Sequence, residues 1–408
     1  MASSDPYANF CVHPFVKMFV STQSEMRPCC VSKPLKNPNT NVRFQTIESV
    51  WNGEDFQKLR QSFNQRQIPE HICRACIDTE KNGAWSHRQY ENKKWKQLTD
   101  FYFNNPHTIV PSPVSFDLRL SNECNLQCVM CHPQLSNQIA KSMSKYNKFN
   151  KENPYTLEYD VEKYIESDSV SNQKFINHII ANADMTQEIW CLGGEPFVMK
   201  PVISLIETLV EKKQSNHISL KMISNGTVIK ESWIEKYLTK FKDVWIGISL
   251  DATEDILEYV RYPSSWTILQ QKIINLKKIC DRYPNFSVSL EPTIQLLNLK
   301  ALPKLFTFAN ENNFIINFSC LDDPIPLFFG NSTQEYRSDI VSQLNRNSNL
   351  TQDSNLTKHG WLNWVKNQPQ KFLNEKEKIY FKYMIEYFDD TRPVRFLKLY
   401  PEFEFMLD

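Results

Sequence analysis

Apolar runs of strand length alternate with helical stretches along the middle of the chain. The strand-like runs lie at 114–120, 188–192, 218–223, 244–250, 286–293 and 314–320. Stretches of helical length separate them at 198–213, 230–240, 266–282 and 300–312. Repeated strand-plus-helix units favour a parallel sheet with right-handed crossovers. The pattern therefore predicts an α/β fold, a partial six-stranded (β/α) TIM-like barrel, over residues 111–321.

The pattern differs on either side of this region and in one segment within it. Residues 1–110 are rich in loops, with a short strand-like run at 17–21, an amphipathic stretch at 49–64 and a helical stretch that reaches residue 96. The polar segment 134–184 is longer than one crossover helix needs and predicts a helical insertion. Helical stretches at 332–346, 357–368 and 372–388 follow the barrel. We expect three parts: a small cysteine-rich module at 1–110, the barrel at 111–321 and a mainly helical extension at 322–408.

The loop after the first predicted barrel strand carries three cysteines at C-x3-C-x2-C spacing. They are Cys124, Cys128 and Cys131. Three thiolates can hold three irons of a 4Fe-4S cube, whose fourth iron then stays open to a small molecule. Zinc fits less well, because structural zinc usually takes paired C-x2-C or C/H ligands and the candidate fourth ligand, His132, directly follows Cys131.

Composition narrows the class of protein. The 408 residues are 41% hydrophobic, and 47 Lys and Arg balance 46 Asp and Glu, so bulk charge indicates no polyanionic partner. The first residues do not form a secretory signal, and there is no apolar run of 18 residues, so we expect a cytoplasmic protein without a membrane segment. In a reducing compartment, clustered cysteines indicate metal binding or catalysis. The lone Cys191, Cys280 and Cys320 are interpreted as packing residues.

Five further cysteines lie in the N-terminal region, and they predict a second metal site. They are Cys11, Cys29, Cys30, Cys73 and Cys76. A closed site takes four ligands, so one cysteine is spare, and the vicinal Cys29 and Cys30 point in different directions if the chain is extended there. Either an iron-sulfur cluster or zinc can occupy four cysteines, and both interpretations remain open.

The cysteine loop resembles the signature of the radical SAM superfamily. The resemblance implies that the open iron chelates S-adenosylmethionine and that an electron from the cluster releases a 5'-deoxyadenosyl radical, with a reductant such as flavodoxin or ferredoxin as partner. The N-terminal cysteines resemble twitch or SPASM-like auxiliary modules, although here the module precedes the barrel instead of following it.

The four residues that follow the second barrel strand match another element of that family, the sequence GGEP. They are Gly193, Gly194, Glu195 and Pro196. By resemblance this element lines the methionyl amine of the cofactor. Glycines permit close approach of the backbone to a ligand, and the Glu195 carboxylate can offset an ammonium. Alone, the four residues would be an ordinary turn at a helix start.

Further candidates follow later strands. The resemblance places Ser249 and Asp251 near the ribose and the substrate, and it pairs Arg261 with the methionyl carboxylate, which suits a planar guanidinium. Met130 occupies the position of an adenine-contacting aromatic residue. Polar groups that face cofactor or substrate are also expected in the turn 224–227 and at Glu291 and Gln295. The alternative for Arg261 is an ordinary surface arginine. The alternative for the turn is a helix cap.

Auxiliary-cluster relatives frequently modify peptides or proteins, so the leading hypothesis is radical modification of a peptide or protein side chain. A nucleotide or nucleic-acid base is the alternative substrate, because residues 1–110 carry 14 Lys and Arg against 10 Asp and Glu and include Trp51, Trp85 and Trp95. An alternative of another class is a zinc-stabilised binding protein without catalysis. The GGEP element and Arg261 argue against it, since an inert scaffold needs no cofactor contacts.

Overall fold

The structure, a computed structural model, describes residues 5–37, 40–150, 152–166, 169–317, 319–321, 323–346 and 365–407. The chain divides into two compact units. The first unit comprises Met1–Ser121, Asp168–Lys221 and Lys240–Asp243, and the second comprises Asn122–Ser167, Met222–Thr239 and Val244–Asp408. The predicted division at residues 110 and 321 stays a prediction.

Strands of the first unit pair in the order β2-β1-β3-β4, followed by the beginning of β5. Their bounds are β1 (Lys17–Val20), β2 (Met26–Arg27), β3 (Ser115–Leu118), β4 (Glu188–Cys191) and β5 (Ser219–Ser224). β1 runs antiparallel to β2 and parallel to β3, with Lys17 opposite Ser115 and Val20 opposite Leu118. β3 is parallel to β4. The short strand of the N-terminal region therefore belongs to the same sheet as the first predicted barrel strand.

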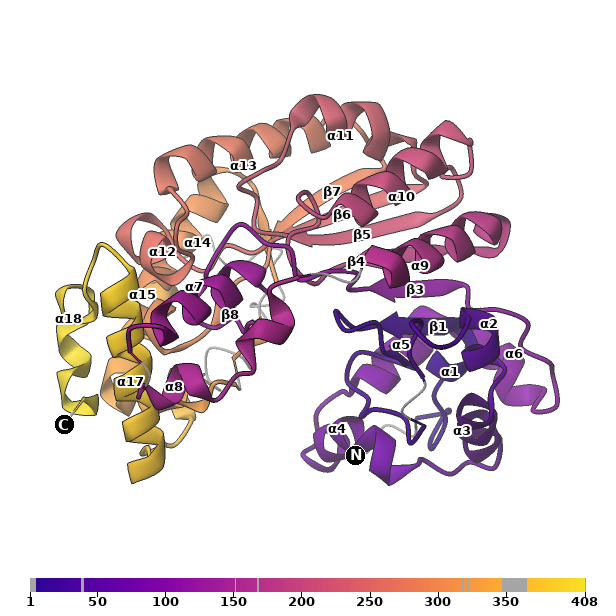
Figure 1. The fold of residues 1–408 in the computed structure, drawn as a ribbon, viewed down its shortest axis with the longest axis horizontal. Coiled ribbons are helices and arrows are strands. Elements are labelled where there is room, and N and C mark those ends of the chain that lie inside the picture. The colour runs from indigo at the N-terminus through magenta and orange to yellow at the C-terminus, as the bar shows by residue number, and fades with distance from the viewer. Residues whose placement is uncertain are drawn as a thin grey trace. The chain divides into compact units, whose positions relative to one another are not determined.

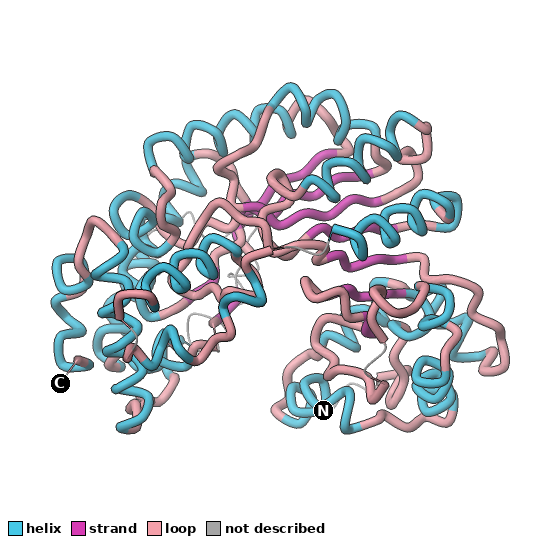
Figure 2. Tube along the Cα trace, viewed as in Figure 1, coloured by secondary structure: helices cyan, strands magenta, loops and turns pink. Residues whose placement is uncertain are grey.

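Most helices of the first unit lie in its N-terminal part. They are α1 (His13–Val16), α2 (Ile47–Trp51), α3 (Glu54–Asn64), α4 (Glu70–Lys81), α5 (His87–Lys94) and α6 (Lys96–Asn104), joined later in the chain by α9 (Ser169–Ala181), η2 (Ala183–Met185) and α10 (Lys200–Glu211). Gly53 separates α2 from α3, so the amphipathic stretch at 49–64 forms two helices. Ser86 and Gln89 form a capping box that starts α5. α9 packs against α10 (Figure 2).

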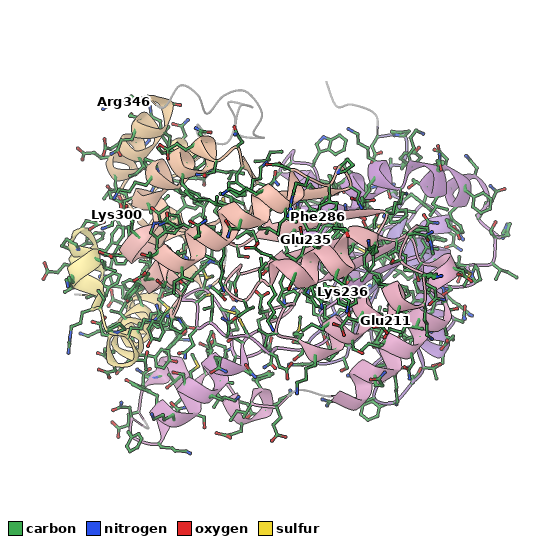
Figure 3. The ribbon with its side chains drawn as sticks, turned by 90° about the horizontal axis from the view of Figure 1, so that it is seen from above. Glu211, Glu235, Lys236, Phe286, Lys300 and Arg346 are labelled. Atoms are coloured by element: carbon green, nitrogen blue, oxygen red, sulfur yellow. The ribbon has the colours of Figure 1, made fainter. Side chains whose placement is uncertain are left out.

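The second unit holds the rest of β5 and the strands β6, β7 and β9 in that order. β6 (Asp243–Ile248) is parallel to β7 (Phe286–Leu290), and β7 is parallel to β9 (Ile315–Ile316). The predicted strand at 286–293 breaks at Glu291, and β8 (Thr293–Ile294) pairs instead with β10 (Ser319–Cys320). Helix α13 (Trp266–Cys280) packs on β7 and on α11 (Glu231–Tyr237), where Figure 3 labels Glu235 and Lys236.

Later segments of the second unit pack on its inserted helices. The elements are α7 (Asn137–Asn147), α8 (Pro154–Leu157), η1 (Val161–Tyr164), α12 (Glu254–Val260), η4 (Leu296–Ala301), α14 (Leu302–Glu311), η5 (Ile325–Leu327), η6 (Phe329–Asn331), α15 (Gln334–Arg346), α17 (Glu375–Thr391), α18 (Phe396–Leu399) and η9 (Pro401–Met406). α17 contacts α8, and both lie near α7 in Figure 1. One apolar cluster joins Val129 of the cysteine loop to Phe381 and Phe388 of α17. The helix expected at 357–368 falls largely outside the described residues.

Parallel pairing dominates both units, and helices connect the parallel strands. This arrangement confirms the predicted α/β class, with a small N-terminal module and C-terminal helices. η3 (Leu238–Lys240) precedes β6. Among the helices that the structure describes, none combines the length and the apolar character that crossing a bilayer requires.

Candidate functional site

The loop that follows β3 brings three cysteines together in the second unit. None of these three cysteines forms a disulfide; Cys128 is buried, and Cys124 and Cys131 are half-buried. The Cys131 amide donates to the Cys128 carbonyl at 3.1 Å, and the Ser136 hydroxyl donates to the Leu126 carbonyl at 2.7 Å. Burial raises the pKa of the Cys131 thiol, and the sulfurs of Cys128 and Cys124 raise it further. A thiolate at Cys131, which burial and the neighbouring sulfurs disfavour, would be stabilised by a cationic centre shared with them.

Arg261 lies directly against this cysteine group. Its Nε donates to Asp251 Oδ2 at 2.7 Å, and its Nη1 lies 3.8 Å from the Cys128 sulfur. The backbone N–H of Thr293 donates to the other Asp251 oxygen at 2.8 Å. Asp251 is fully buried and Arg261 is buried. Burial alone would lower the pKa of Arg261, but Asp251 and Cys128 raise it above its usual value. Arg261 therefore stays charged beside the cysteines.

A second arginine, which sequence analysis did not select, also contacts the cysteine loop. Arg392 follows α17, and its Nη2 donates to the Gln127 carbonyl at 2.7 Å. Its Nη1 donates to the Tyr259 carbonyl, and its guanidinium lies 4.1 Å from the ring centre of Phe388. The C-terminal extension carries no motif that resembles a known site, so no local signal marks this residue. Only the folded chain places it beside the loop.

The turn after β5 is bonded to the same loop. Asn225 Nδ2 donates to Asn125 Oδ1 at 2.9 Å, and Asn125 Nδ2 donates to Thr227 Oγ1 at 2.8 Å. Asn225 Nδ2 also lies 4.0 Å from the Cys124 sulfur. The backbone N–H of Ser249 donates to the Ser224 carbonyl at 2.8 Å, which ties the end of β6 to this turn. Of the residues expected here from the sequence, the turn is bonded to the cysteine loop, and Ser249 is bonded to the turn.

The remaining candidates of the second unit differ in their surroundings. Met130 is half-buried and packs against the apolar cluster that holds α17. Glu291 accepts hydrogen bonds from Ser289 at 2.7 Å and from Asn317 at 2.8 Å, and burial raises its pKa. Gln295 is fully buried at the start of η4. The carboxyl of Glu291 therefore already has protein partners.

The GGEP element lies in the first unit, after β4. Gly193 has a φ of +105°, and a Cβ there would come within 2.8 Å of the Ser121 carbonyl oxygen. The N–H of Gly194 donates to that same oxygen at 2.9 Å. Glu195 and Pro196 are buried, and Glu195 Oε1 accepts the N–H of Phe197 at 3.2 Å. Glycine is thus required at position 193 by both conformation and space.

Four of the five N-terminal cysteines surround one small cavity in the first unit. Its lining includes Cys11, Cys29, Cys73 and Cys76 and, beside them, His13, Val31, Ser32, His87 and Arg88; its volume is about 20 Å³. All four thiols are free. Burial raises the pKa of Cys73 to about 12, and Cys29 and Cys76 contribute in the same direction. Burial likewise raises the pKa of Cys11 and of Cys29, and other cysteines of this group raise each further.

Cys30 lies outside that lining and has different neighbours. Its sulfur is 3.8 Å from His87 Nε2. Burial raises its pKa to about 11, Asp117 raises it further, and Arg119 and Lys17 lower it. The vicinal pair Cys29 and Cys30 thus separates, with Cys29 at the four-cysteine cavity and Cys30 in a neighbouring charged environment.

That charged environment centres on Glu91 of α5. His13 Nε2 and Lys17 Nζ each lie 3.4 Å from Glu91 Oε2, and the Trp95 indole donates to the same oxygen at 3.2 Å. Burial would raise the pKa of Glu91, but the hydrogen bond from His13 and the charges of His13, Lys17 and Lys94 lower it below its usual range. Lys17 also lies 3.8 Å from Glu188. The four-cysteine cavity is therefore bordered by a buried ionic network.

The two cysteine groups differ in what they can bind. Four thiols that line one cavity, two of them buried and two half-buried, form a complete donor set for a 4Fe-4S cluster or a structural zinc. Three thiols on one loop can hold only three irons of such a cluster, which leaves the fourth for another ligand. The three sulfurs on one loop and the adjacent cationic Arg261 fit an anionic iron-sulfur group at the loop.

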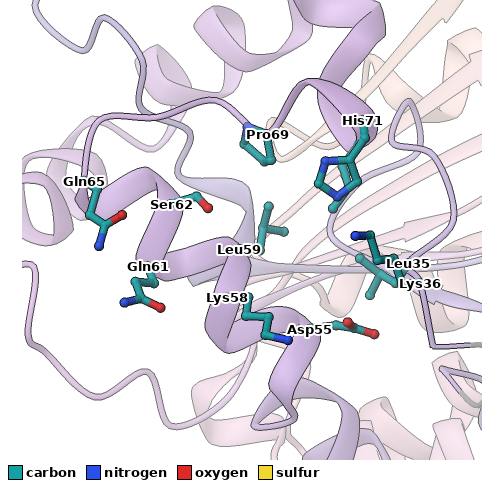
Figure 4. Close-up of a pocket in the computed structure, with 11 residues that line it drawn as sticks. Leu35, Lys36, Asp55, Lys58, Leu59, Gln61, Ser62, Gln65, Pro69 and His71 are labelled. Atoms are coloured by element: carbon teal, nitrogen blue, oxygen red, sulfur yellow. The ribbon is translucent and has the colours of Figure 1, made fainter.

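A separate pocket of about 380 Å³ lies beside α3 in the first unit (Figure 4). Its floor is apolar, with the buried side chains Leu35, Leu59 and Ile72. Its rim is polar and carries Lys36, Lys58, Asp55, Gln61, Ser62, Gln65 and His71. Among the described residues that line it, none is a cysteine.

Two family profiles match the chain. The Radical SAM superfamily matches residues 118–291, which include Cys124, Cys128 and Cys131. An iron-sulfur cluster-binding domain, SPASM, matches residues 11–77, which begin at Cys11 and include Cys73 and Cys76. The chain thus carries a radical SAM domain preceded by an iron-sulfur cluster-binding domain. The two matches confirm the resemblance predicted from the sequence, including the position of the iron-sulfur module before the radical SAM segment, and both kinds of domain imply iron-sulfur clusters.

Solved structures show weaker likeness. "Native anSMEcpe with bound AdoMet" is 17% identical, with a TM-score of 0.37 over 57% of this chain and 59% of that one. Streptococcus suis SuiB bound to S-adenosylmethionine is 15% identical, with a TM-score of 0.39 over 78% of this chain and 64% of that one. SuiB bound to precursor peptide SuiA is 14% identical, with a TM-score of 0.37 over 72% and 64%. The chain spans between 59% and 64% of the length of these structures. A comparison with curated proteins found no match.

Proposed function

We propose that Cys124, Cys128 and Cys131 hold a 4Fe-4S cluster that cleaves S-adenosylmethionine reductively, and that the protein thereby modifies a peptide or protein side chain. The observation that carries this proposal is the group of three cysteines on one loop with the Arg261–Asp251 pair against it. When bound, the cluster supplies an electron to the sulfonium of S-adenosylmethionine, which yields a 5'-deoxyadenosyl radical able to abstract hydrogen from a substrate carbon.

The residues around the loop prepare the cysteines for this role. Burial raises the pKa of Cys128, and the Arg261 guanidinium lowers it, so Arg261 favours the thiolate that ligation requires. Asp251 holds Arg261 in one orientation through a charge-assisted hydrogen bond of 2.7 Å. We propose that Arg261, Asp251, Ser249 and Met130 are contacts of the cofactor. The GGEP residues 193–196 remain predicted cofactor contacts as well.

We propose that Cys11, Cys29, Cys73 and Cys76 hold an auxiliary 4Fe-4S cluster and that Cys30 is the spare cysteine. The support is the shared cavity, which the first four line and Cys30 does not. With four protein ligands this cluster has no open iron, so its role is electron transfer or substrate positioning and not cleavage of the cofactor. A flavodoxin or ferredoxin is the kind of reductant that would supply electrons.

Iron and sulfide quantification with EPR on anaerobically reconstituted protein tests both cluster assignments. We expect about eight irons in the wild type and about four in a Cys124/Cys128/Cys131 triple Ala variant, since each full cluster holds four. Adding S-adenosylmethionine should change the EPR signal of the wild type and leave that of the variant unchanged. Zinc in place of iron in both proteins would instead indicate a binding protein without radical chemistry.

The substrate class is tested by the formation of 5'-deoxyadenosine. The reconstituted protein, reduced with dithionite, is given S-adenosylmethionine and size-fractionated cell extract. We expect stimulation by a peptide-containing fraction that survives nuclease treatment and is lost on protease treatment. Stimulation that survives protease treatment and is lost on nuclease treatment would contradict a peptide substrate and indicate a nucleic acid.

A further inference from the structure

Arg392 is a buried cation without an ion-pair partner. Its side chain is 8% exposed, and its guanidinium contacts the carbonyls of Gln127 and Tyr259 and the rings of Phe388, Tyr259 and Tyr262. Among the described residues, no carboxylate lies within 4.0 Å of its guanidinium; the charge of Arg392 favours the ionised form of Asp389, but the two make no ion pair. Desolvating a full charge costs several kcal/mol unless a counter-charge or strong hydrogen bonds offset it. These contacts offset only part of that cost, so an anion nearby would stabilise the arrangement.

Arg261 provides an internal contrast, since it is equally buried and close to the same cysteine. The Asp251 carboxylate neutralises Arg261 at 2.7 Å, and Asp251 is itself fully buried. Arg261 therefore has a carboxylate in direct contact, whereas Arg392 has none within 4.0 Å among the described residues. The charge of Arg392 lies at the loop that carries the three cysteines, since its Nη2 donates to the Gln127 carbonyl at 2.7 Å.

The contacts of Arg392 also fix the geometry of that loop. The N–H of Gln127 donates to the Tyr262 carbonyl at 2.6 Å, and the N–H of Val129 donates to the Val260 carbonyl at 2.9 Å. The loop therefore runs beside the segment 259–262, and Arg392 binds one backbone carbonyl of the loop and one of that segment. The planar guanidinium fork suits such a bridge, which a lysine ammonium would reproduce less well.

We propose that Arg392 is a positioning residue that supplies the counter-charge for an anionic iron-sulfur cluster at Cys124, Cys128 and Cys131 and clamps the cysteine loop to residues 259–262. This inference rests on the proposed function, because it needs a cluster at that loop. A fixed cation stabilises the reduced, more negative cluster, since reduction potentials follow net charge and hydrogen bonding around the cluster. The C-terminal extension thereby becomes part of the reactive centre through a residue that touches neither cofactor nor substrate.

The test is a redox titration of reconstituted full-length protein, followed by EPR of the reduced cluster, with iron content measured in parallel. Arg392→Met removes the charge and keeps much of the length of the side chain, and Arg392→Lys keeps the charge. Arg395→Met is the matched control, because Arg395 is exposed on the same segment. Cys11, Cys29, Cys73 and Cys76 are replaced by Ala in every protein, so that only the loop cluster gives a signal.

We expect Arg392→Met to lower the ratio of reduced to oxidised cluster at least tenfold at a fixed potential, which is a midpoint about 59 mV more negative for one electron. Arg392→Lys should recover most of that shift, and Arg395→Met should match the parent protein. If Arg392→Met fails to retain iron, retention by Arg392→Lys still supports the counter-charge. An unchanged midpoint in Arg392→Met, or equal loss of iron in both Arg392 variants, would overturn the inference. A parent protein without any cluster at the loop would instead contradict the proposed function.

Discussion

The two cysteine groups of this chain are built in opposite ways. The four N-terminal cysteines come from three separate points between Cys11 and Cys76, and the fold of the first unit brings them to one cavity. The three loop cysteines lie within eight consecutive residues, and their spacing alone brings them close. A site assembled from distant points depends on the fold, whereas a site on one loop depends on what holds the loop. If each group holds a four-iron cluster, as we propose, the first supplies all four ligands, and the second leaves one iron for another ligand.

The two cysteine groups also differ in how nearby carboxylates balance the positive charges around them. Beside the closed site, Glu91 and Glu188 balance Lys17 in a buried network. At the open site two arginines lie near Cys128, and among the described residues only Arg261 has a carboxylate within 4.0 Å. This weaker balance of the positive charge would suit the proposed cluster, which must accept an electron and bind an anionic carboxylate. Closed sites that serve structure or electron transfer have no such requirement.

The largest expected effect is that of replacing one loop cysteine, which should remove both cofactor cleavage and one cluster. Cys128→Ala should abolish formation of 5'-deoxyadenosine and remove about four irons, because two cysteines cannot hold a stable cube. Liquid chromatography of the products and iron quantification measure the two effects. Cys280→Ala is the control, since Cys280 is also buried in the second unit and lies in α13. Cleavage that persists in Cys128→Ala would remove the reactive cluster from this loop.

A matched pair of variants tests which cysteines close the N-terminal site. Cys76→Ala should lose about four irons and unfold more readily, because the metal–ligand bonds contribute folding energy directly. Cys30→Ala should keep its iron, since Cys30 does not line the cavity. Iron quantification and thermal unfolding under anaerobic conditions compare the two. Equal loss of iron in both variants would show that Cys30 is a ligand and that the closed site differs from the one described.

Removing the charge of Asp251 tests how far the open site depends on its buried ion pair. Asp251→Asn should lower the free energy of unfolding by about 3–5 kcal/mol, because it leaves Arg261 buried without its counter-charge. Glu54→Gln is the control, since it breaks an exposed pair with Lys58 and should change stability too little to measure. Urea unfolding of both cluster-free variants checks the difference. Similar stabilities would mean that solvent or a different partner compensates Arg261.

The smallest expected effect concerns Glu91 beside the closed site, and it depends on pH. The pKa of Glu91 is lowered in the folded protein, so its contribution to stability is complete above the unfolded pKa of about 4.5 and is lost as the pH falls below it. Glu91→Gln should cost about 1.5–3 kcal/mol at pH 7. The difference from wild type should shrink as the pH falls from 5 to 3. Urea unfolding across this range measures it, and a difference independent of pH would assign the cost to packing.

Local pattern predicted much of the fold. The strands expected at 188–192 and 244–250 correspond to Glu188–Cys191 and Asp243–Ile248, and the helix expected at 372–388 corresponds to Glu375–Thr391. These elements are set by residues close in sequence. The break of the predicted strand at Glu291 was missed, because an apolar run does not show where a strand changes partner. Pairing of β1 with β3 was also missed, since strand partners far apart leave no mark in local periodicity.

The candidate site was predictable where spacing defines it. Cys124, Cys128 and Cys131 follow from a motif, and so does the GGEP turn, whose Gly193 has the positive φ that glycine permits. The choice between Cys29 and Cys30 required the fold, because adjacent residues are chemically alike in sequence. Arg392 could not be found at all, because its importance arises from contacts with residues more than a hundred positions away.

The position of β3 between β1 and β4 determines how this protein can be divided. β1 covers one edge of β3 over its whole length, from Ser115 to Leu118, and Phe116 and Leu118 are fully buried. A shortened protein that begins at residue 111 would expose that edge, with unpaired backbone groups and apolar side chains that invite pairing with other chains. The segment that matches the radical SAM superfamily, 118–291, is thus not a unit that can be excised. A soluble fragment that contains it would have to begin before Lys17.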